Sequence, residues 1–110
     1  MPAGNYDIII EKKATFSFSA SFKQANGSAL NLTNRTLTGE IRRDFDNGLQ
    51  ATFTITKTNA TGGAANISLT STQTSALTLD DSHYDIFSVI SGTTEKLLEG
   101  KATIIKNITA

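Results

Sequence analysis

Cysteine and tryptophan are absent from the 110-residue chain, and its one proline is Pro2. Without cysteine there is no disulfide, no thiolate nucleophile and no Cys-ligated zinc. Small secreted domains often depend on disulfides at this length, so we expect a chain that is made and folded in a cytoplasm. Because the proline stands near the N-terminus, no later strand contains a residue that lacks a backbone N–H.

An excess of one charge is also lacking, since 10 Lys and Arg balance 10 Asp and Glu. A balanced chain has no electrostatic footprint for nucleic acid or for an anionic membrane surface. No apolar run approaches the roughly 20 residues that a membrane-spanning helix needs, and MPAGNYDIII has no basic segment typical of a signal peptide. We therefore expect no nucleic-acid partner, no membrane partner and no leader.

Asparagine and threonine are abundant, and they create several N-x-[ST] triplets. Such triplets signal glycosylation only when a chain enters a secretory pathway, and nothing in the sequence predicts that route. We interpret them as chance products of composition. The triplets begin at Asn31, Asn34, Asn59, Asn66 and Asn107.

Apolar residues alternate with polar ones along much of the chain, which is typical of strands with one buried face. In ATFSFSASF, Phe16, Phe18 and Ala20 point one way while Ser17 and Ser19 point the other. Similar segments are separated by turn signals that contain Asn, Asp and Gly. The expected strands cover about 6–13, 14–22, 36–43, 51–58, 64–71, 83–91 and 95–106, and the main turns fall at ANG, DFDNG, NATGG and GTT.

Two segments depart from simple alternation. Residues 83–91, HYDIFSVIS, are apolar on both faces and are predicted to form a central strand. The preceding STQTSALTLDD predicts one helical turn near residues 72–79, with Leu77 and Leu79 closing one end of the fold. About seven short strands with regular turns indicate an all-β sandwich or small barrel. We expect one domain over residues 1–110.

Candidate metal sites have simpler explanations. DFDNG resembles the opening of a calcium loop, but the flanking helices and the distant Glu of an EF-hand are missing, so a turn is favoured. LDDSHYD places Asp80, Asp81 and Asp85 around the only histidine, His83. Asp81, His83 and Asp85 would share a strand face, but a polar loop entering a strand is the favoured interpretation. We expect no metal, no cofactor and no catalytic residue.

Other polar and aromatic residues leave alternatives open. Glu95 and Glu99 are expected on one strand face as solvated charges. Tyr6 and Tyr84 could stack on a sugar, although both lie where strands begin and packing is the favoured explanation. A basic cluster beside Glu40 is either a salt-bridged outer face or a subunit contact, where Arg is enriched. Its members are Arg35, Arg42 and Arg43.

Three segments follow one another in a recognisable order: ATFSFSASFKQANGSALNLTNRTLTGEIRR, GGAANISLTSTQTSAL and YDIFSVISGTTEKLLEGKATI. From about Tyr6 to Ile104, this order resembles a family of short proteins encoded by tailed bacteriophages. The shared features are an aromatic-rich strand, an N-G turn, NLT, a charged IR strand, a T-x-A-L turn, YD and LLEG. Such proteins resemble the immunoglobulin-like N-terminal domain of phage baseplate upper proteins, which anchors receptor-binding fibres to the tail.

The resemblance implies an immunoglobulin-like antiparallel β-sandwich and a non-enzymatic virion protein. We expect a tail baseplate or tail-fibre adaptor subunit, made in the bacterial host cytoplasm and assembled into the virion tail in several copies. Its partners would be other phage baseplate, tail or fibre subunits. Because no fibre region follows Ala110, we expect a free-standing module. The alternatives are a capsid decoration protein, a host-glycan-binding module and, least favoured, a metal-assisted hydrolase built on His83.

Strand edges are the expected means of contact. Both terminal segments are apolar and carry little charge to protect an edge, so YDIIIEKK and KATIIKNITA are predicted to pair with neighbouring subunits through backbone hydrogen bonds. The predicted interface residues are Tyr6, Ile8, Ile10, Arg42, Arg43, Ile104 and Ile108.

Overall fold

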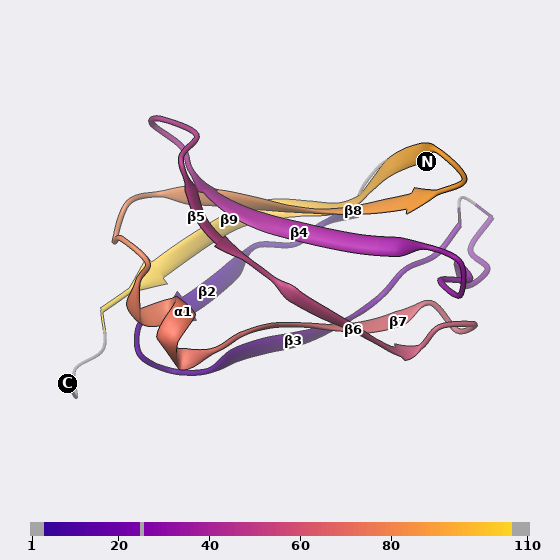
Figure 1. Cartoon of the computed structure of the whole chain (residues 1–110), viewed down its shortest axis with the longest axis horizontal. Helices are drawn as coiled ribbons and strands as arrows, with labels where there is room; N and C mark the ends of the chain where they lie inside the picture. Colours follow the sequence, from indigo (N-terminus) through magenta and orange to yellow (C-terminus); the bar gives the residue numbers. More distant parts are fainter. Residues whose placement is uncertain (1–3, 25, 107–110) are drawn as a thin grey trace.

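Two β-sheets face each other in the structure, and a short helix lies at one end (Figure 1). The structure is a computed structural model that describes residues 4–24 and 26–106. The elements are β1 (Gly4–Asn5), β2 (Ile8–Glu11), β3 (Phe16–Ser21), β4 (Thr36–Arg43), β5 (Leu49–Thr52), β6 (Thr54–Asn59), β7 (Ala64–Leu69), α1 (Ser71–Ser75), β8 (Ser82–Ile90) and β9 (Thr93–Ile105).

The larger sheet has six strands in the order β1-β9-β8-β4-β5, with β2 also paired with β9. The smaller sheet has three strands in the order β3-β7-β6. β1 and β2 run parallel to β9, whereas the other strand pairs are antiparallel. β8 lies between β9 and β4, so the prediction of a central strand there is confirmed. The predicted all-β sandwich is confirmed as well.

The strand expected over 51–58 is divided between the two sheets. β5 pairs with β4 in the larger sheet, and β6 pairs with β7 in the smaller one. The chain crosses between the sheets at Phe53, which is 6% exposed and whose N–H donates to the Gly39 carbonyl at 2.9 Å. The structure has more strands than the predicted seven for two reasons. This crossing divides one expected strand, and β1 lies before the strand that was expected over residues 6–13.

A bulge in β9 places two successive leucines in the core. Ile86 lies opposite Leu98, but the next residue of β8, Phe87, lies opposite Lys96, so Leu97 has no partner residue. Leu97 and Leu98 are 5% and 9% exposed. An extra residue reverses the alternation of faces along a strand. If the β9 side chains after the bulge follow the predicted alternation, those before it therefore point to the opposite face from the one that the alternation predicts.

The bulge corrects the prediction that Glu95 and Glu99 share a face. Glu95 lies opposite the buried Ser88, and Glu99 lies opposite Asp85 on the outer face. Arg35 donates from Nη1 to Ser88 Oγ at 3.0 Å and approaches Glu95 Oε1 at 3.3 Å. Glu95 thus belongs to a polar group at one end of the sandwich interior, separate from the charges of the outer face.

The core lies between the sheets and is formed by the inward residues of the predicted alternation. Ile10, Ile41, Ile67 and Ile86 are fully buried. Aromatic rings join the layers, because Tyr84 of the larger sheet lies edge-on to Phe53 and Phe18, with centroids 5.9 and 6.3 Å away. The other buried or partly buried hydrophobic residues of this core include Phe16, Phe22, Leu30, Leu32, Ile55, Leu69 and Ala102.

The predicted helical turn is confirmed as α1, and its local sequence explains where it begins. Thr70 caps the helix by accepting from the Gln73 N–H at 3.2 Å, and Gln73 Oε1 accepts from the Thr70 N–H at 2.9 Å. Such a capping box satisfies two backbone donors that the first turn leaves unpaired. Leu77 follows the helix and is 1% exposed, as predicted, but the prediction for Leu79 is wrong because it is 54% exposed.

Two of the N-x-[ST] triplets form local turns. Asn31 Oδ1 accepts from the Thr33 N–H at 2.9 Å and from the Thr33 hydroxyl at 2.6 Å. Asn59 Oδ1 accepts from the Gly62 N–H at 3.1 Å and the Thr61 hydroxyl at 3.3 Å. Asparagine side chains commonly stabilise turns in this way. The triplets therefore have a structural use in the loops between strands.

Candidate interaction surface

The isoleucines predicted to form the interface lie inside the fold. Ile8, Ile10 and Ile104 are 4%, 0% and 6% exposed, and Ile10 is directly opposite Ile104 in the pairing of β2 with β9. Their side chains fill the core of the monomer, so the prediction that they contact another subunit is wrong. The alternation of β2 makes the neighbouring residue, Ile9, the exposed one at 65%.

The two terminal segments also differ in their edges. Residues 102–105 of β9 have β2 on one side, and Ala102 lies opposite Ser82 of β8 on the other, so the prediction of a free edge at the start of KATIIKNITA is wrong there. β2 has β9 as its only strand partner within the described chain. β2 therefore has an open edge along its whole length, where Ile9 is exposed, and Ile105 of the paired strand is 39% exposed. Ile108 lies outside the described residues.

The remaining predicted interface residues are spread across the larger sheet. Tyr6 follows β1 and is 54% exposed, with its ring 5.6 Å from that of Phe18. Its carbonyl accepts a hydrogen bond from the Tyr84 hydroxyl. Burial raises the pKa of Tyr84, which keeps this hydroxyl protonated as a donor. Arg42 and Arg43 end β4, which β8 and β9 separate from β2. The structure thus does not bring the predicted residues into one patch.

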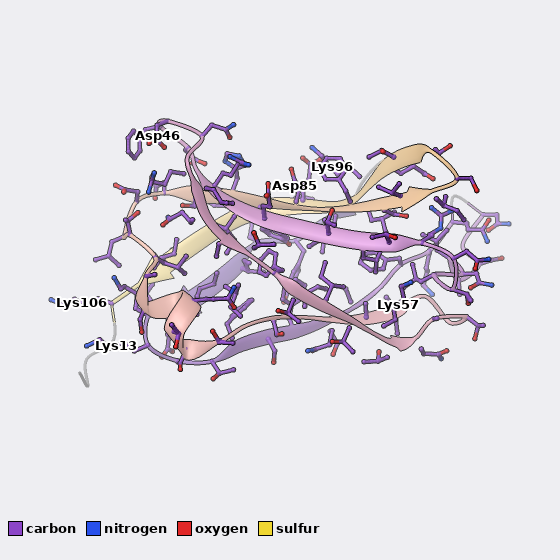
Figure 2. All side chains as sticks on the ribbon, in the orientation of Figure 1. Lys13, Asp46, Lys57, Asp85, Lys96 and Lys106 are labelled. Carbon is purple, nitrogen blue, oxygen red and sulfur yellow. The ribbon has the colours of Figure 1, made fainter. Side chains whose placement is uncertain are left out.

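The outer face of the larger sheet carries a row of three carboxylates. Glu40 lies opposite Asp85, and Asp85 lies opposite Glu99, so the acids stand side by side on β4, β8 and β9. Directly opposite side chains in a sheet are close neighbours, and like charges there are unfavourable. Figure 2 shows Asp85 near the centre of this face with Lys96 beside it.

A second row, made of basic residues, lies two residues further along each of the same strands. Arg42 lies opposite His83, and His83 lies opposite Lys101. Arg42 also pairs with Glu40 at 3.0 Å, which links the two rows. We name the surface formed by both rows the charged face. Its residues are Glu40, Asp85, Glu99, Arg42, His83 and Lys101.

Two shallow hollows flank β8 on the charged face. One, of about 540 Å³, lies toward β9 and includes Asp7, Asp85, Lys96 and Glu99 in its lining. The other, of about 580 Å³, lies toward β4 and shares Asp85 with the first. Burial raises the pKa of Asp85, and Glu40 raises it further, against the lowering effect of Lys96, His83 and Arg42. Asp85 is thus the acid for which folding most disfavours the charged form on this face.

Replacing Asp85 with asparagine is expected to raise the stability of the fold slightly at neutral pH. A carboxyl whose pKa is raised by folding stabilises the native state fully below its unfolded pKa, and this contribution is lost as the pH rises through the folded pKa. Urea unfolding of both proteins should show Asp85→Asn more stable by at most about 0.5 kcal/mol at pH 7. The difference should vanish below about pH 3.5. A gain that persists in acid, or a loss at pH 7, would contradict this explanation.

The geometry around His83 does not form a hydrolytic triad. His83 Nδ1 lies 2.7 Å from Asp44 Oδ1, but the neighbouring Ser82 is fully buried. Its hydroxyl donates to the Asp80 carbonyl at 3.0 Å and accepts from Gln50 Nε2 at 2.9 Å. No hydrogen bond joins His83 to a hydroxyl in the part of the chain that the structure describes. Among residues 4–24 and 26–106, no group of three or more His, Asp or Glu side chains is arranged to hold a metal ion.

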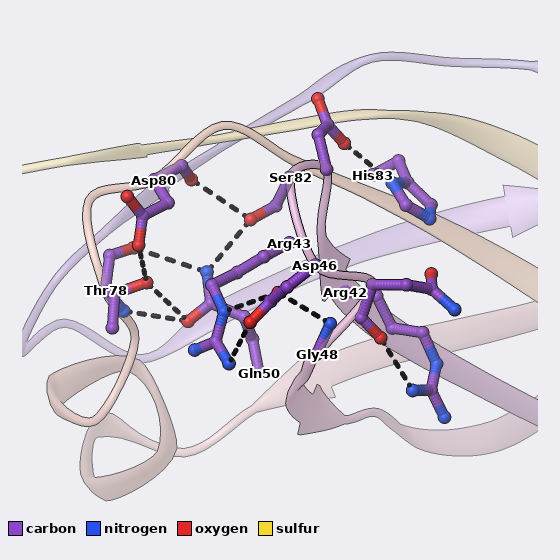
Figure 3. Close-up of polar contacts among 11 residues, drawn as sticks. Arg42, Arg43, Asp46, Gly48, Gln50, Thr78, Asp80, Ser82 and His83 are labelled. Atoms are coloured by element: carbon purple, nitrogen blue, oxygen red, sulfur yellow. Dashed lines mark hydrogen bonds and ion pairs between the residues drawn. The ribbon is translucent and has the colours of Figure 1, made fainter.

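DFDNG forms the tight hairpin that joins β4 to β5 (Figure 3). Asp46 accepts from Arg43 Nε at 3.1 Å and from the Gly48 N–H at 2.8 Å, and this hydrogen bonding lowers the pKa of Asp46. Asn47 has a φ of 56°, which asparagine tolerates better than most residues. At the tip, Phe45 is 73% exposed. Phe45 was not among the residues predicted to have a function, although an apolar residue inside an acidic turn was the available signal.

Comparisons with known proteins bear on the fold. No protein-family model and no curated protein matches the chain. Among solved structures, the chain is similar to the Lin-41 filamin domain, with 14% identity, a TM-score of 0.46 and coverage of 88% of this chain and 82% of that one. It is also similar to a chain from a study of multimeric cell-adhesive interactions of VGSC beta subunits, with 10% identity, a TM-score of 0.53 and 92% of both chains covered.

The fold class is therefore an immunoglobulin-like β-sandwich, as predicted. At this level of identity the likeness concerns the backbone arrangement alone, and function has to be argued from surfaces. The helical part of the described chain contains no segment with the length and hydrophobicity that a membrane-spanning helix requires.

Proposed function

We propose that the chain is a non-enzymatic structural subunit of a tailed-bacteriophage particle, placed at the tail baseplate or as a fibre adaptor. The proposal combines the resemblance of Tyr6 to Ile104 to short phage proteins with an immunoglobulin-like sandwich whose exposed features suit protein contacts. Its partners are other tail, baseplate or fibre subunits, and the protein is present in several copies after synthesis in the host cytoplasm.

The observation that carries the contact mechanism is the open edge of β2. Backbone groups on the unpaired side of an edge strand can add a strand from a neighbouring protein. Natural edges are commonly protected by charges or proline, but the exposed centre of β2 is Ile9. Because Ile9 is exposed beside this edge, an added strand would meet an apolar side chain as well as hydrogen-bonding groups.

Placing a lysine at the centre of this edge should weaken assembly without unfolding the protein. Ile9 is exposed, so Ile9→Lys should change the free energy of unfolding by no more than about 0.5 kcal/mol. A desolvated charge would oppose pairing with an apolar neighbour, and we expect the number of copies per particle to fall at least about tenfold. Quantitative mass spectrometry of purified particles measures this number.

The matched control is Ile9→Val, which keeps an apolar β-branched side chain at the same place and should assemble normally. Particles that contain Ile9→Lys at the wild-type level would show that the β2 edge is not the contact. A hit on a host-glycan array that Ile9→Lys leaves unchanged would instead favour a sugar-binding role for another surface.

A further inference from the structure

The tip of the β4–β5 hairpin holds an aromatic ring in solvent although the ring adds nothing to the core. Phe45 is 73% exposed, more than any other exposed large hydrophobic residue described. The Arg43 guanidinium lies over the ring, 5.7 Å from its centroid. Two backbone hydrogen bonds of 2.9 Å close the turn: the Arg43 N–H donates to the Gly48 carbonyl, and the Asn47 N–H donates to the Arg43 carbonyl. A ring held by an ordered turn loses little conformational entropy when it binds.

The hairpin is also tied to the loop that precedes β8. The Asp44 N–H donates to the Asp81 carbonyl at 2.9 Å. The Gln50 side chain accepts from the Thr78 N–H at 2.8 Å and donates to Ser82 Oγ at 2.9 Å. Figure 3 shows the bonds of Gln50 with Thr78 and Ser82, beside the separate group that Arg43, Asp46 and Gly48 form in the hairpin. The exposed tip and the loop therefore form a single fixed surface.

This surface is acidic. Phe45, Asp44, Asp80 and Asp81 line a hollow of about 350 Å³ between the hairpin and the loop. The Arg43 guanidinium pairs with Asp46 at 3.1 Å and also interacts electrostatically with Asp80, and His83 Nδ1 lies 2.7 Å from Asp44 Oδ1. The carboxylates of Asp44, Asp46, Asp80 and Asp81 outnumber this one guanidinium, so the surface keeps an excess of negative charge.

We propose that this acidic hairpin tip, formed by Phe45, Asp80 and Asp81, docks into a protein partner that offers an apolar pocket bordered by Lys or Arg. The inference deepens the proposed function and rests on it, because it specifies the chemistry of one partner subunit. A buried aromatic side chain surrounded by complementary charge is the usual form of an interaction hot spot. A second copy of the chain fits less well, since it would bring its own acids to the same surface.

Leu79 is a second exposed hydrophobic residue, on the loop that is tied to the hairpin. It is 54% exposed and lies between Thr78, which is fixed by Gln50, and Asp80. Its exposure corrects the sequence prediction of a core position, and docking gives that exposure a use. The partner pocket should therefore contact the loop as well as the ring.

Truncating the ring should impair docking and leave the fold intact. Phe45→Ser should lower the number of copies per particle at least about tenfold, as expected for a hot-spot residue. Asp80→Lys combined with Asp81→Lys should have a similar effect through charge repulsion. The control is Val89→Ser, which alters a 37% exposed residue at the far end of β8 and should assemble normally. Thermal unfolding of each variant should match that of the wild type.

A photo-crosslinking phenylalanine analogue at position 45, with one at position 89 as control, identifies the contact in particles. We expect position 45 to crosslink to a peptide with apolar residues flanked by Lys or Arg, and the double lysine variant to lower the yield at least about tenfold. Normal assembly of Phe45→Ser, no crosslink from position 45 in particles that contain the chain, or a crosslink to a second copy would overturn the inference and leave the proposed function standing.

If the chain is absent from particles, the proposed function fails. The same crosslinking experiment in infected cells then tests the docking surface separately. A crosslinked peptide of the stated chemistry would still support the docking surface. The absence of any crosslink there would overturn the surface as well.

Discussion

The variant Gly63→Ala is expected to unfold with a free energy lowered by about 3 kcal/mol, because two unfavourable terms act together. Gly63 has a φ of 76°, where a side chain costs about 1–2 kcal/mol. A Cβ at this position would lie 2.5 Å from the Phe22 carbonyl oxygen and 2.8 Å from that of Leu30. The Phe22 N–H donates to the Gly63 carbonyl at 2.8 Å. The two carbonyl oxygens can therefore move away from a new Cβ only if this hydrogen-bonded segment is disturbed.

Gly27→Ala is the matched control for this prediction. Gly27 has a similar φ of 89°, but a Cβ there would meet nothing within 4 Å. Its replacement should cost only about 1 kcal/mol, which is the conformational term alone. Urea unfolding at pH 7 measures both losses. Equal losses for the two variants would show that the 22–30 segment does not pack against Gly63 as described.

Replacing Ile10 with alanine should lower the free energy of unfolding by about 3 kcal/mol, since truncating a buried isoleucine removes apolar burial and leaves a cavity. Ile10 is fully buried and lies opposite Ile104, so its side chain has no route to solvent. The loss would be a large part of the roughly 5–15 kcal/mol that stabilises a typical domain.

Ile9→Ala is the control on the same strand, because it removes the same atoms from a side chain that is 65% exposed. Its effect should stay within about 0.5 kcal/mol. Chemical denaturation of the two variants compares them directly. A larger loss for Ile9→Ala than for Ile10→Ala would mean that β2 presents the opposite face to the core.

Period-two alternation predicted the strands well wherever one face is buried and the other is wet. In β3, Phe16 and Phe18 are less exposed than Ser17 and Ser19, as expected. The N-cap at Thr70 and the turn at DFDNG follow from local chemistry, so they too could be predicted from the sequence. Local patterns suffice when the physical cause lies within a few residues.

Features that depend on distant segments could not be predicted from local sequence patterns. The bulge at Leu97 depends on how β9 meets β8, and the crossing at Phe53 depends on which sheet each half of the segment joins. Glu99 gains its acidic neighbours, Asp85 and Glu40, only through strand pairing between segments far apart in sequence. Alternation alone does not encode these long-range choices.

The candidate interface also has features that local patterns predicted and features that depend on long-range strand pairing. Apolar terminal segments correctly indicated strands, but the interpretation assigned the core residues Ile8, Ile10 and Ile104 to contacts. The parallel pairing of β2 with residues 102–105 of β9 covers one side of the C-terminal segment. The open edge at Ile9 therefore emerged only from the strand order.

Mass spectrometry of purified phage particles, with heads and tails separated, shows whether the protein is a tail subunit. We expect to find the chain in the tail fraction at a fixed number of copies, retained after washing in high salt. Recovery with heads would move the protein to the capsid, and its absence from both fractions would contradict a role as a structural subunit.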